Sequence, residues 1–172
     1  MISYIRAHIL AWLAPKHRLR CRTALWTKIV EELARRGAGE RESGAFLLGR
    51  SLNGRGEVLD VVYYDDLAPT ALVAGAILFP GSAYGALWRI CGERGMQVVA
   101  DIHTHPNRAY QSSIDSEHPM IAQAGHLALI LPRYAQTPLV DTEIGFYEYL
   151  GGRRWKNHSG AEVTSIFLRT ML

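Results

Sequence analysis

The chain has 172 residues, of which 48% are hydrophobic and 20% are charged, and its formal net charge is +3. This length suits one domain with a hydrophobic core, and the composition is ordinary for a soluble globular protein. Its two cysteines, Cys21 and Cys91, do not form a CxxC pair, which excludes a disulfide framework and a thiolate zinc ribbon and favours a reducing compartment.

The positive charge is concentrated at the start of the chain. Residues 1–36 contain eight Lys and Arg against two Glu, a net charge of +6, and the remainder is mildly acidic. Apolar residues recur at helical spacing up to Leu13, and Pro15 ends that pattern. We expect residues 1–22 to form a basic amphipathic extension and residues 23–172 to form the domain. Such an extension suits an acidic partner, nucleic acid or a membrane surface, although a solvated helix face is the simpler interpretation.

The sequence also bears on location. No apolar run approaches the ~20 residues that a membrane span needs. The apolar stretch over residues 7–14 is short, and the basic residues after it are wrong for a signal-peptide cleavage region. We therefore expect a cytoplasmic protein without a membrane span.

The first half of the domain alternates helical and strand patterns. An apolar stripe predicts a helix from the N-cap Thr23 to Gly37. Residues 44–48 and 58–64 read as strands joined by a polar turn, Asn53-Gly54-Arg55-Gly56. Residues 65–79 lack firm periodicity and are expected to form a loop, with a short strand near residues 76–79.

The second half continues the alternation. We expect a helix capped by Ser82 and stopped by Gly95, a strand over residues 96–102, and a helix over residues 116–124 that tolerates Pro119 in its first turn. Residues 126–131, 143–150 and 162–168 read as strands, the last two joined by the Gly151-Gly152 turn and a basic loop. Strands interleaved with helices predict a mixed α/β fold.

One strand end carries the sequence Asp101-Ile102-His103-Thr104-His105-Pro106. Residues two apart on a strand point to the same side, so His103 and His105 share a face and Thr104 points away. Two adjacent imidazoles make half of a zinc site, and a carboxylate from the next element would be a suitable third ligand. Alone, this HxH pattern is weak, because paired histidines on strands are often surface or core residues.

The order of residues around the histidines is more specific. Glu42 comes first, His103-Thr104-His105-Pro106 follows, and then come Ser112 and Asp115. In this order the chain resembles the JAMM/MPN metallopeptidases over roughly residues 23–170. The resemblance implies a curved mixed β-sheet flanked by helices, related to the cytidine deaminase architecture. The loop between the second histidine and the serine is one residue shorter than the usual pattern.

The resemblance also implies roles for these residues. His103, His105 and Asp115 would bind one Zn²⁺, leaving the fourth position to water. Glu42 would be the general acid/base, and Ser112 would stabilise the oxyanion. Because the loop is shorter, Ser113 remains an alternative to Ser112. Read without the family, Ser112 and Asp115 also match a helix-capping pattern.

The family cleaves isopeptide or peptide bonds after the carboxyl terminus of ubiquitin or a ubiquitin-like protein. The resemblance thus implies a ubiquitin-like protein or its conjugates as substrate and conjugation enzymes as further partners, with no nucleic acid. The alternative is a non-catalytic scaffold of the same family, although scaffolds lose the zinc ligands that this chain retains. A metal-dependent amidohydrolase would need a larger barrel and later histidines, and a cytidine deaminase would need a P-C-x-x-C motif.

Three further side chains have simpler expected roles. Asp101 lies on the histidine face and is a candidate for orienting a metal ligand. His118 and His126 are expected to be surface or packing residues.

Overall fold

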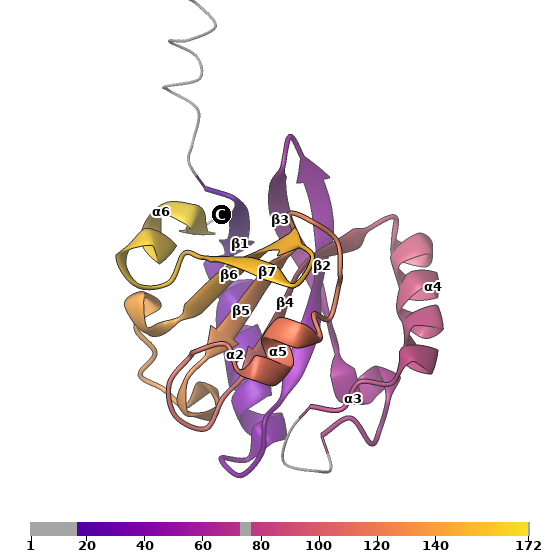
Figure 1. Cartoon of the computed structure of the whole chain (residues 1–172), viewed down its shortest axis with the longest axis horizontal. Coiled ribbons are helices and arrows are strands. Elements are labelled where there is room, and N and C mark those ends of the chain that lie inside the picture. Colours follow the sequence, from indigo (N-terminus) through magenta and orange to yellow (C-terminus); the bar gives the residue numbers. More distant parts are fainter. Residues whose placement is uncertain (1–16, 73–76, 172) are drawn as a thin grey trace, which may run out of the picture.

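The computed structural model describes residues 17–72 and 77–171, which form a mixed α/β fold around one curled sheet (Figure 1). The sheet has eight strands in the order β7-β6-β5-β4-β2-β3-β1-β8. The strands are β1 Leu19–Arg22, β2 Gly44–Leu52, β3 Arg55–Tyr63, β4 Gln97–Thr104, β5 Leu127–Leu131, β6 Gly145–Gly151, β7 Arg154–Asn157 and β8 Phe167–Thr170. The α-helices are α2 Thr23–Gly37, α3 Tyr64–Leu67, α4 Tyr84–Arg94, α5 Ser113–Glu117 and α6 Val163–Ile166.

Strand β2 lies at the centre of the sheet. It pairs antiparallel with β3 on one side and with β4 on the other. Strand β4 in turn pairs parallel with β5, and β5, β6 and β7 continue as antiparallel neighbours. The histidine strand is therefore internal, which holds its carboxyl end rigidly in the middle of the molecule.

Alternation along β2 divides the core into two layers. Ala45 and Leu47 are buried on the face that packs against the apolar stripe of α2. Phe46 and Leu48 point the other way, into a second cluster that includes Leu87 of α4. Successive side chains of a strand face opposite sides, so a sheet covered on both faces reads as the continuous apolar run seen in this strand. Figure 1 shows α4 at the edge of the molecule and α5 in front of the sheet.

The first strand was not expected from the sequence. Residues 19–22 fall inside the expected amino-terminal extension, yet they form β1 and pair parallel with β3 and β8. The sheet therefore begins before residue 23. The extension's expected helix, up to Leu13, lies outside the described residues. The strand runs directly into α2, so Arg22 occupies the N-cap in extended conformation without a side-chain cap, and Thr23 is the first helical residue rather than the cap.

The expected helix over residues 116–124 is wrong in position, because α5 spans Ser113–Glu117. Ser112 and Asp115 form a reciprocal capping box, which starts the helix earlier. Pro119 then disfavours helical geometry at His118, whose φ is −124° and ψ is 66°. The capping pattern thus defines the helix, and the proline lies beyond its end.

Four other segments differ from expectation. The expected strand stops at Tyr63, and the start of the expected loop forms the short helix α3, Tyr64–Leu67. Residues 162–168 are not one strand: Val163 and Ile166 bury one face of the short helix α6 before β8 begins. The basic loop after Gly152 contains β7, whose mostly exposed residues pair with β6. Residues 77–79 form no strand, and residue 76 lies outside the described residues.

The other helix ends are only partly as expected. Gly37 is the last residue of α2, and the left-handed C-cap is Ala38, with φ 52°. Helix α4 ends at Gly95, which has the left-handed conformation of a C-cap with φ 59°. A 3₁₀ turn, Gly81–Ala83, replaces the expected cap by Ser82. No helix in the described ranges is long and apolar enough to span a bilayer.

Candidate metal centre

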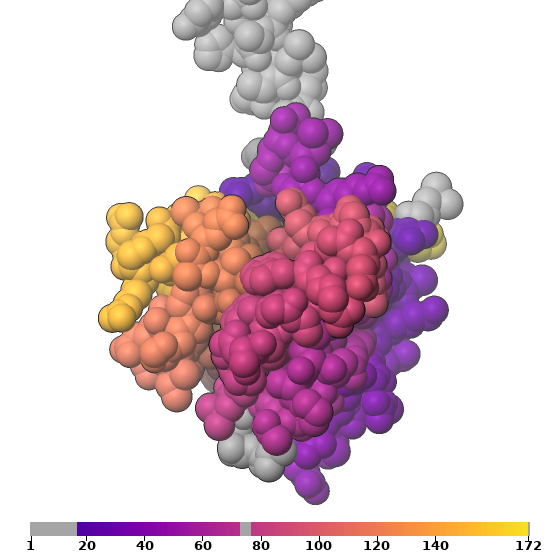
Figure 2. Space-filling model, turned by 90° about the vertical axis from the view of Figure 1, so that its right-hand side faces the viewer, coloured from indigo at the N-terminus to yellow at the C-terminus, as the bar shows by residue number. Residues whose placement is uncertain are grey.

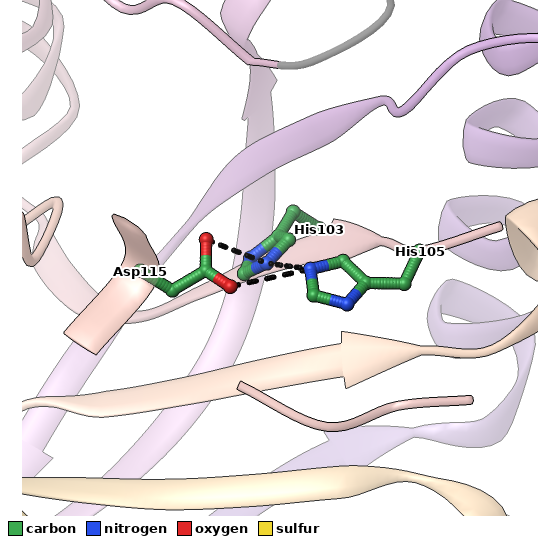
Figure 3. Close-up of side chains that lie close together, drawn as sticks. All are labelled: His103, His105 and Asp115. Atoms are coloured by element: carbon green, nitrogen blue, oxygen red, sulfur yellow. Dashed lines mark hydrogen bonds and ion pairs between the residues drawn. The ribbon is translucent and has the colours of Figure 1, made fainter. Parts of the chain in front are cut away.

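Two buried histidines meet at the carboxyl end of β4. His103 is the next-to-last residue of the strand and His105 follows it directly. The two Nε2 atoms lie 3.1 Å apart, and both side chains point toward the same spot (Figure 3). The HxH pattern therefore produces the shared face that the strand period requires.

Asp115 reaches this spot from the first turn of α5 (Figure 3). Its carboxylate oxygens lie 3.5 Å from Nε2 of His103 and 3.3 Å from Nε2 of His105. One candidate ligand atom from each of these three residues lies within 4.8 Å of the others. The structure therefore brings together the three predicted metal ligands.

The capping box holds Asp115 in place. The backbone N–H and the hydroxyl of Ser112 donate to one carboxylate oxygen of Asp115, at 2.8 and 2.7 Å. In return, the N–H of Asp115 donates to the Ser112 hydroxyl at 3.1 Å. The capping pattern and the ligand pattern are thus the same pair of residues, and one arrangement serves both.

Glu42 approaches the histidines from the residues that precede β2. Its Oε1 lies 3.9 Å from Nε2 of His105. The neighbouring Ser43 fixes this approach, because its N–H donates to the Thr104 hydroxyl at 2.9 Å and its own hydroxyl donates to the carbonyl of Leu33 at 2.8 Å. Thr104 thus points away from the site, as expected, and connects the glutamate segment to the histidine strand.

Gly44 is required at the start of β2. A Cβ at this position would collide with the ring of Tyr64 and would lie 3.0 Å from the carbonyl oxygen of Ile102. Because Gly44 pairs with His103 in the sheet register, the close approach of these backbones sets the distance between Glu42 and the histidines.

The charges of Glu42, His103 and Asp115 influence one another's pKa values, because the three side chains lie close together. Burial raises the pKa of Glu42. Burial also opposes ionisation of Asp115, but the hydrogen bonds from His103 and His105 outweigh it and hold the pKa of Asp115 well below its usual range. For His103, burial lowers the pKa and Asp115 raises it, and the carboxylate has the larger net effect.

The arrangement fits a cation. The two Nε2 atoms, 3.1 Å apart, are close enough for both to bind one Zn²⁺ at the usual Zn–N distance of about 2.0–2.1 Å. Two imidazoles with one carboxylate form a donor set that suits Zn²⁺. Nδ1 of His103 is buried and, within the described part of the chain, has no hydrogen-bond partner, although the second nitrogen of a ligating histidine usually has one.

Backbone hydrogen bonds to β5 and to the strained turn that follows it hold the main chain of His105 in place. Its N–H donates to the carbonyl of Leu131, and its carbonyl accepts from Tyr134 at 2.8 Å. Arg133, Tyr134 and Ala135 all have left-handed φ values of 53°, 53° and 61°, a conformation that is costly for residues with a Cβ. Sequence reasoning missed this turn, because it contains no Gly or Asn.

The structure pairs Asp101 with His126. The Oδ1 atom of Asp101 lies 2.6 Å from Nε2 of His126, and each side chain is only 3% exposed. Asp101 was a candidate for orienting a ligand, but its hydrogen-bond partner is this histidine, which directly precedes the neighbouring parallel strand β5. His126 is a buried hydrogen-bonding residue, whereas His118 is exposed.

A cavity of about 700 Å³ opens beside the cluster. Its lining includes Glu42, His103, Ser112 and Asp115, and it does not include Ser113. Of the two serines, Ser112 is therefore the one placed next to the cavity.

Comparisons with known proteins give a partial sequence match and two structures with a similar fold. No family model matches the chain. The chain is similar to probable metalloprotease y4jG from Sinorhizobium fredii, with 30% identity over 78 residues that cover 45% of this chain and 48% of that protein. The chain thus spans about half the length of this curated relative.

Solved structures share the fold. A solution structure of a protein from Desulfitobacterium hafniense has a TM-score of 0.63 and 13% identity, covering 89% of this chain and 94% of that one. A second solution structure, from Salinibacter ruber, has a TM-score of 0.57 and 17% identity, covering 88% and 91%. At these identities the likeness concerns the fold alone.

Proposed function

We propose that this protein is a zinc-dependent peptidase or isopeptidase of the JAMM/MPN type. The observation that carries the proposal is the convergence of His103, His105 and Asp115 on one point, with Glu42 beside it at the edge of a cavity. A relative named as a probable metalloprotease supports the same reaction class.

In this proposal the two imidazoles and the Asp115 carboxylate hold Zn²⁺. Bound there, zinc supplies a Lewis acid that polarises a scissile carbonyl and lowers the pKa of a water molecule. The three ligands contribute only one negative charge, so the site keeps a net positive charge that makes the metal effective.

Glu42 moves the proton. Its carboxylate accepts a proton from the attacking water and returns it to the nitrogen of the leaving amine, so that the C–N bond breaks as the N–H bond forms. A separate glutamate suits this role, because a carboxylate occupied as a metal ligand could not carry protons. Ser112 would donate its hydroxyl to the oxyanion of the tetrahedral intermediate. In the structure this hydroxyl donates to Asp115 instead, so in that step it would have to rotate away from the carboxylate.

The proposed substrate is a ubiquitin-like protein, cleaved after its carboxyl terminus, with conjugation enzymes as further partners. This part rests on the order of motif residues rather than on the cavity. An extended tail would bind through main-chain hydrogen bonds, and the segments 65–79 and 132–142 are the candidates for contact with it.

The first test is zinc content. The purified protein should contain about one zinc per chain, the variant His103→Ala/His105→Ala should contain none, and His118→Ala, which changes an exposed histidine of the same cavity, should retain it. If the wild-type protein contains no zinc even after reconstitution, the proposal of a peptidase is wrong, and the non-catalytic scaffold becomes the better interpretation.

The second test addresses the substrate. A ubiquitin-like protein fused to a reporter should be cut by the zinc-loaded protein and not by its Glu42→Gln variant. If the zinc-loaded protein leaves the fusion intact, the proposed substrate is wrong, whereas the proposed metal site is not affected.

A further inference from the structure

Two buried side-chain atoms in the described ranges, residues 17–72 and 77–171, are polar and have no hydrogen-bond partner. They are the hydroxyl oxygen of Tyr64 and Nδ1 of His103. Buried polar groups without a partner are rare in folded proteins, because each one costs free energy. One of the two atoms belongs to a candidate metal ligand, so the position of the other relative to it is of interest.

The Tyr64 ring covers the start of β2, next to the metal cluster. A Cβ at Gly44 would collide with Cε2 of Tyr64, the ring carbon beside the one that carries the hydroxyl. Gly44 pairs with His103 in the sheet register, so the hydroxyl end of the ring lies close to this histidine. Helix α4, which faces the viewer in Figure 2, packs Leu87 into the same buried cluster as Tyr64. Because Tyr64 is 0% exposed, bulk water does not reach its hydroxyl.

A carboxylate also lies near the Tyr64 hydroxyl. Asp101 precedes His103 by two residues on β4, so the two side chains share one face of the sheet. Burial raises the pKa of Tyr64 well above its ordinary value, and the Asp101 carboxylate, the charged group that acts on it most strongly, raises it further. The phenol therefore keeps its proton, and Asp101 is a suitable acceptor for it.

His126 holds one oxygen of this carboxylate. Its Nε2 lies 2.6 Å from Oδ1 of Asp101, and each of the two side chains is 3% exposed. An ionised carboxylate has two acceptor oxygens, so the contact with His126 leaves Oδ2 for a second donor. A buried carboxylate that is fixed at one oxygen is a suitable end for a chain of hydrogen bonds.

Binding of a metal would define the proton on the unpartnered nitrogen. A neutral imidazole has one N–H and one lone pair, so a His103 that binds the metal through Nε2 carries its proton on Nδ1. This N–H is a donor, and the hydroxyl oxygen of Tyr64 is an acceptor. A ligating histidine usually donates its second N–H to an oxygen, which fixes the orientation of the ring. The two unpartnered atoms are therefore complementary when the metal is bound.

We propose that Tyr64 and Asp101 are positioning residues of the metal centre. The Nδ1–H of His103 donates to the Tyr64 hydroxyl, whose own proton is donated to Oδ2 of Asp101, and His126 holds Asp101 at Oδ1. This chain of hydrogen bonds directs the lone pair of Nε2 at the metal and gives both buried atoms a partner. The inference rests on the proposed function, because it requires the metal, and it adds the residues that orient one of the ligands.

Zinc affinity tests the chain of hydrogen bonds without catalysis. Competition with a chromophoric chelator measures the dissociation constant of zinc for the wild-type protein and for Tyr64→Phe, which keeps the ring and removes only the hydroxyl. We expect Tyr64→Phe to bind zinc about 10–100-fold more weakly. A hydroxyl that has no partner in the zinc-loaded protein predicts a different result, because its removal would leave zinc affinity unchanged and raise the midpoint of thermal unfolding. That result would overturn the inference.

Two further variants separate orientation of the ligand from a general loss of structure. Tyr84→Phe removes a hydroxyl that donates to the carbonyl of Met120 at 2.6 Å, so it should lower stability and leave zinc affinity unchanged. Asp101→Asn should weaken zinc binding, and adding Tyr64→Phe to it should have less than the full additional effect, because both changes interrupt one chain. An equal loss of zinc affinity in Tyr84→Phe, or full additivity of the other two changes, would contradict the inference.

The proton on His103 can be observed directly. In zinc-loaded protein with ¹⁵N-labelled histidine, the Nδ1 proton of His103 should give an NMR signal that exchanges slowly with water. Tyr64→Phe should shift this signal or remove it, whereas the ring signals of the exposed His118 should stay unchanged. A His103 signal that is the same in Tyr64→Phe as in the wild-type protein would overturn the inference.

The outcomes distinguish this inference from the proposed function. If the wild-type protein and Tyr64→Phe bind zinc equally well, the chain of hydrogen bonds is wrong, whereas the metal centre and the peptidase are not affected. If Tyr64→Phe weakens zinc binding as expected but the zinc-loaded protein hydrolyses no substrate, the peptidase is wrong and the chain is supported. A wild-type protein that binds no zinc would contradict both proposals.

Discussion

Two clusters of histidine and carboxylate in this molecule use their imidazole nitrogens differently. In one, Nε2 of His103 and Nε2 of His105 face each other at 3.1 Å beside an open cavity. In the other, both nitrogens of His158 already have partners: Nδ1 lies 3.1 Å from Glu162, and Nε2 lies 3.2 Å from Glu148.

In the second cluster the imidazole and the carboxylate between its partners are nearly buried, with the side chains of His158 and Glu148 5% and 13% exposed. Glu148 also accepts two hydrogen bonds from the Arg18 guanidinium, at 3.2 and 3.1 Å. The cluster therefore ties the residue before β1 to β6 and to the turn after β7. In the first cluster, the Nε2 atoms of both histidines and the Asp115 carboxylate face one another beside the cavity. The direction of the nitrogens, rather than the residue types, separates a candidate metal centre from a structural network.

The largest expected effect is on the reaction at the open cluster. Glu42→Gln keeps the size of the side chain and removes its ability to accept a proton, so the hydrolysis rate should fall by about 10²–10⁴-fold. Zinc content and the midpoint of thermal unfolding should stay close to wild type. An active Glu42→Gln variant would contradict the role of Glu42 while leaving the metal centre intact.

The buried pair of Asp101 and His126 should have the largest effect on stability. Replacing His126 with Ala leaves the Asp101 carboxylate buried and unpaired, which should lower the free energy of unfolding by about 3 kcal/mol. Urea unfolding measures this change, and His118→Ala serves as the exposed control. A loss of similar size in His118→Ala would show that the buried contact is not the cause.

The cluster of His158, Glu148 and Arg18 should make the free energy of unfolding depend on pH in the acidic range. Burial raises the pKa of Glu148, but the hydrogen bonds from His158 and Arg18 outweigh it, so the pKa in the folded protein lies below its ordinary value of 4.5. The folded pKa is depressed, so the stabilisation is fully present above the unfolded pKa and is lost as the pH falls through the folded pKa.

Glu148→Gln removes this dependence. The variant should be less stable than wild type by about 1 kcal/mol at pH 7, and the difference should shrink as the pH is lowered below the ordinary glutamate range. Urea unfolding at several pH values measures both quantities. A difference that does not vary with pH would mean that the charge of Glu148 is not responsible.

The smallest effect is expected from an exposed ion pair. Arg89 and Glu93 are one helical turn apart on α4. Nη1 of Arg89 lies 3.0 Å from Oε1 of Glu93, and the two side chains are 64% and 60% exposed. Arg89→Ala should change the free energy of unfolding by less than about 0.5 kcal/mol. Thermal unfolding of this variant gives the reference value for the effects of the two histidine clusters on stability. A larger loss of stability in Arg89→Ala would contradict the expectation that exposed ion pairs contribute least.

Local patterns in the sequence determined much of this protein. The apolar runs and the glycine at residue 95 predicted α2, α4 and the central strands, because strand alternation, helix periodicity and capping depend on residues close in sequence. The same is true of the shared face of His103 and His105. Ser112 and Asp115 could be read as a cap or as part of a site, and the structure shows that the cap is what holds the candidate ligand.

Only the tertiary structure decided how distant segments combine. Strand β1 exists because it pairs with β3 and β8, and β7 exists because it pairs with β6. Neither has a strong apolar pattern of its own. The pairing of Asp101 with His126 likewise depends on the parallel register of β4 and β5.

The candidate site depends on both levels. Its residue types and the order of its motif were visible in the sequence. The distance from Glu42 to His105 was not, because it follows from the pairing of Gly44 with His103 and from the hydrogen bond between Ser43 and Thr104. Contacts between residues 61 positions apart arise only when the sheet closes, and sheet register is a property of the whole fold.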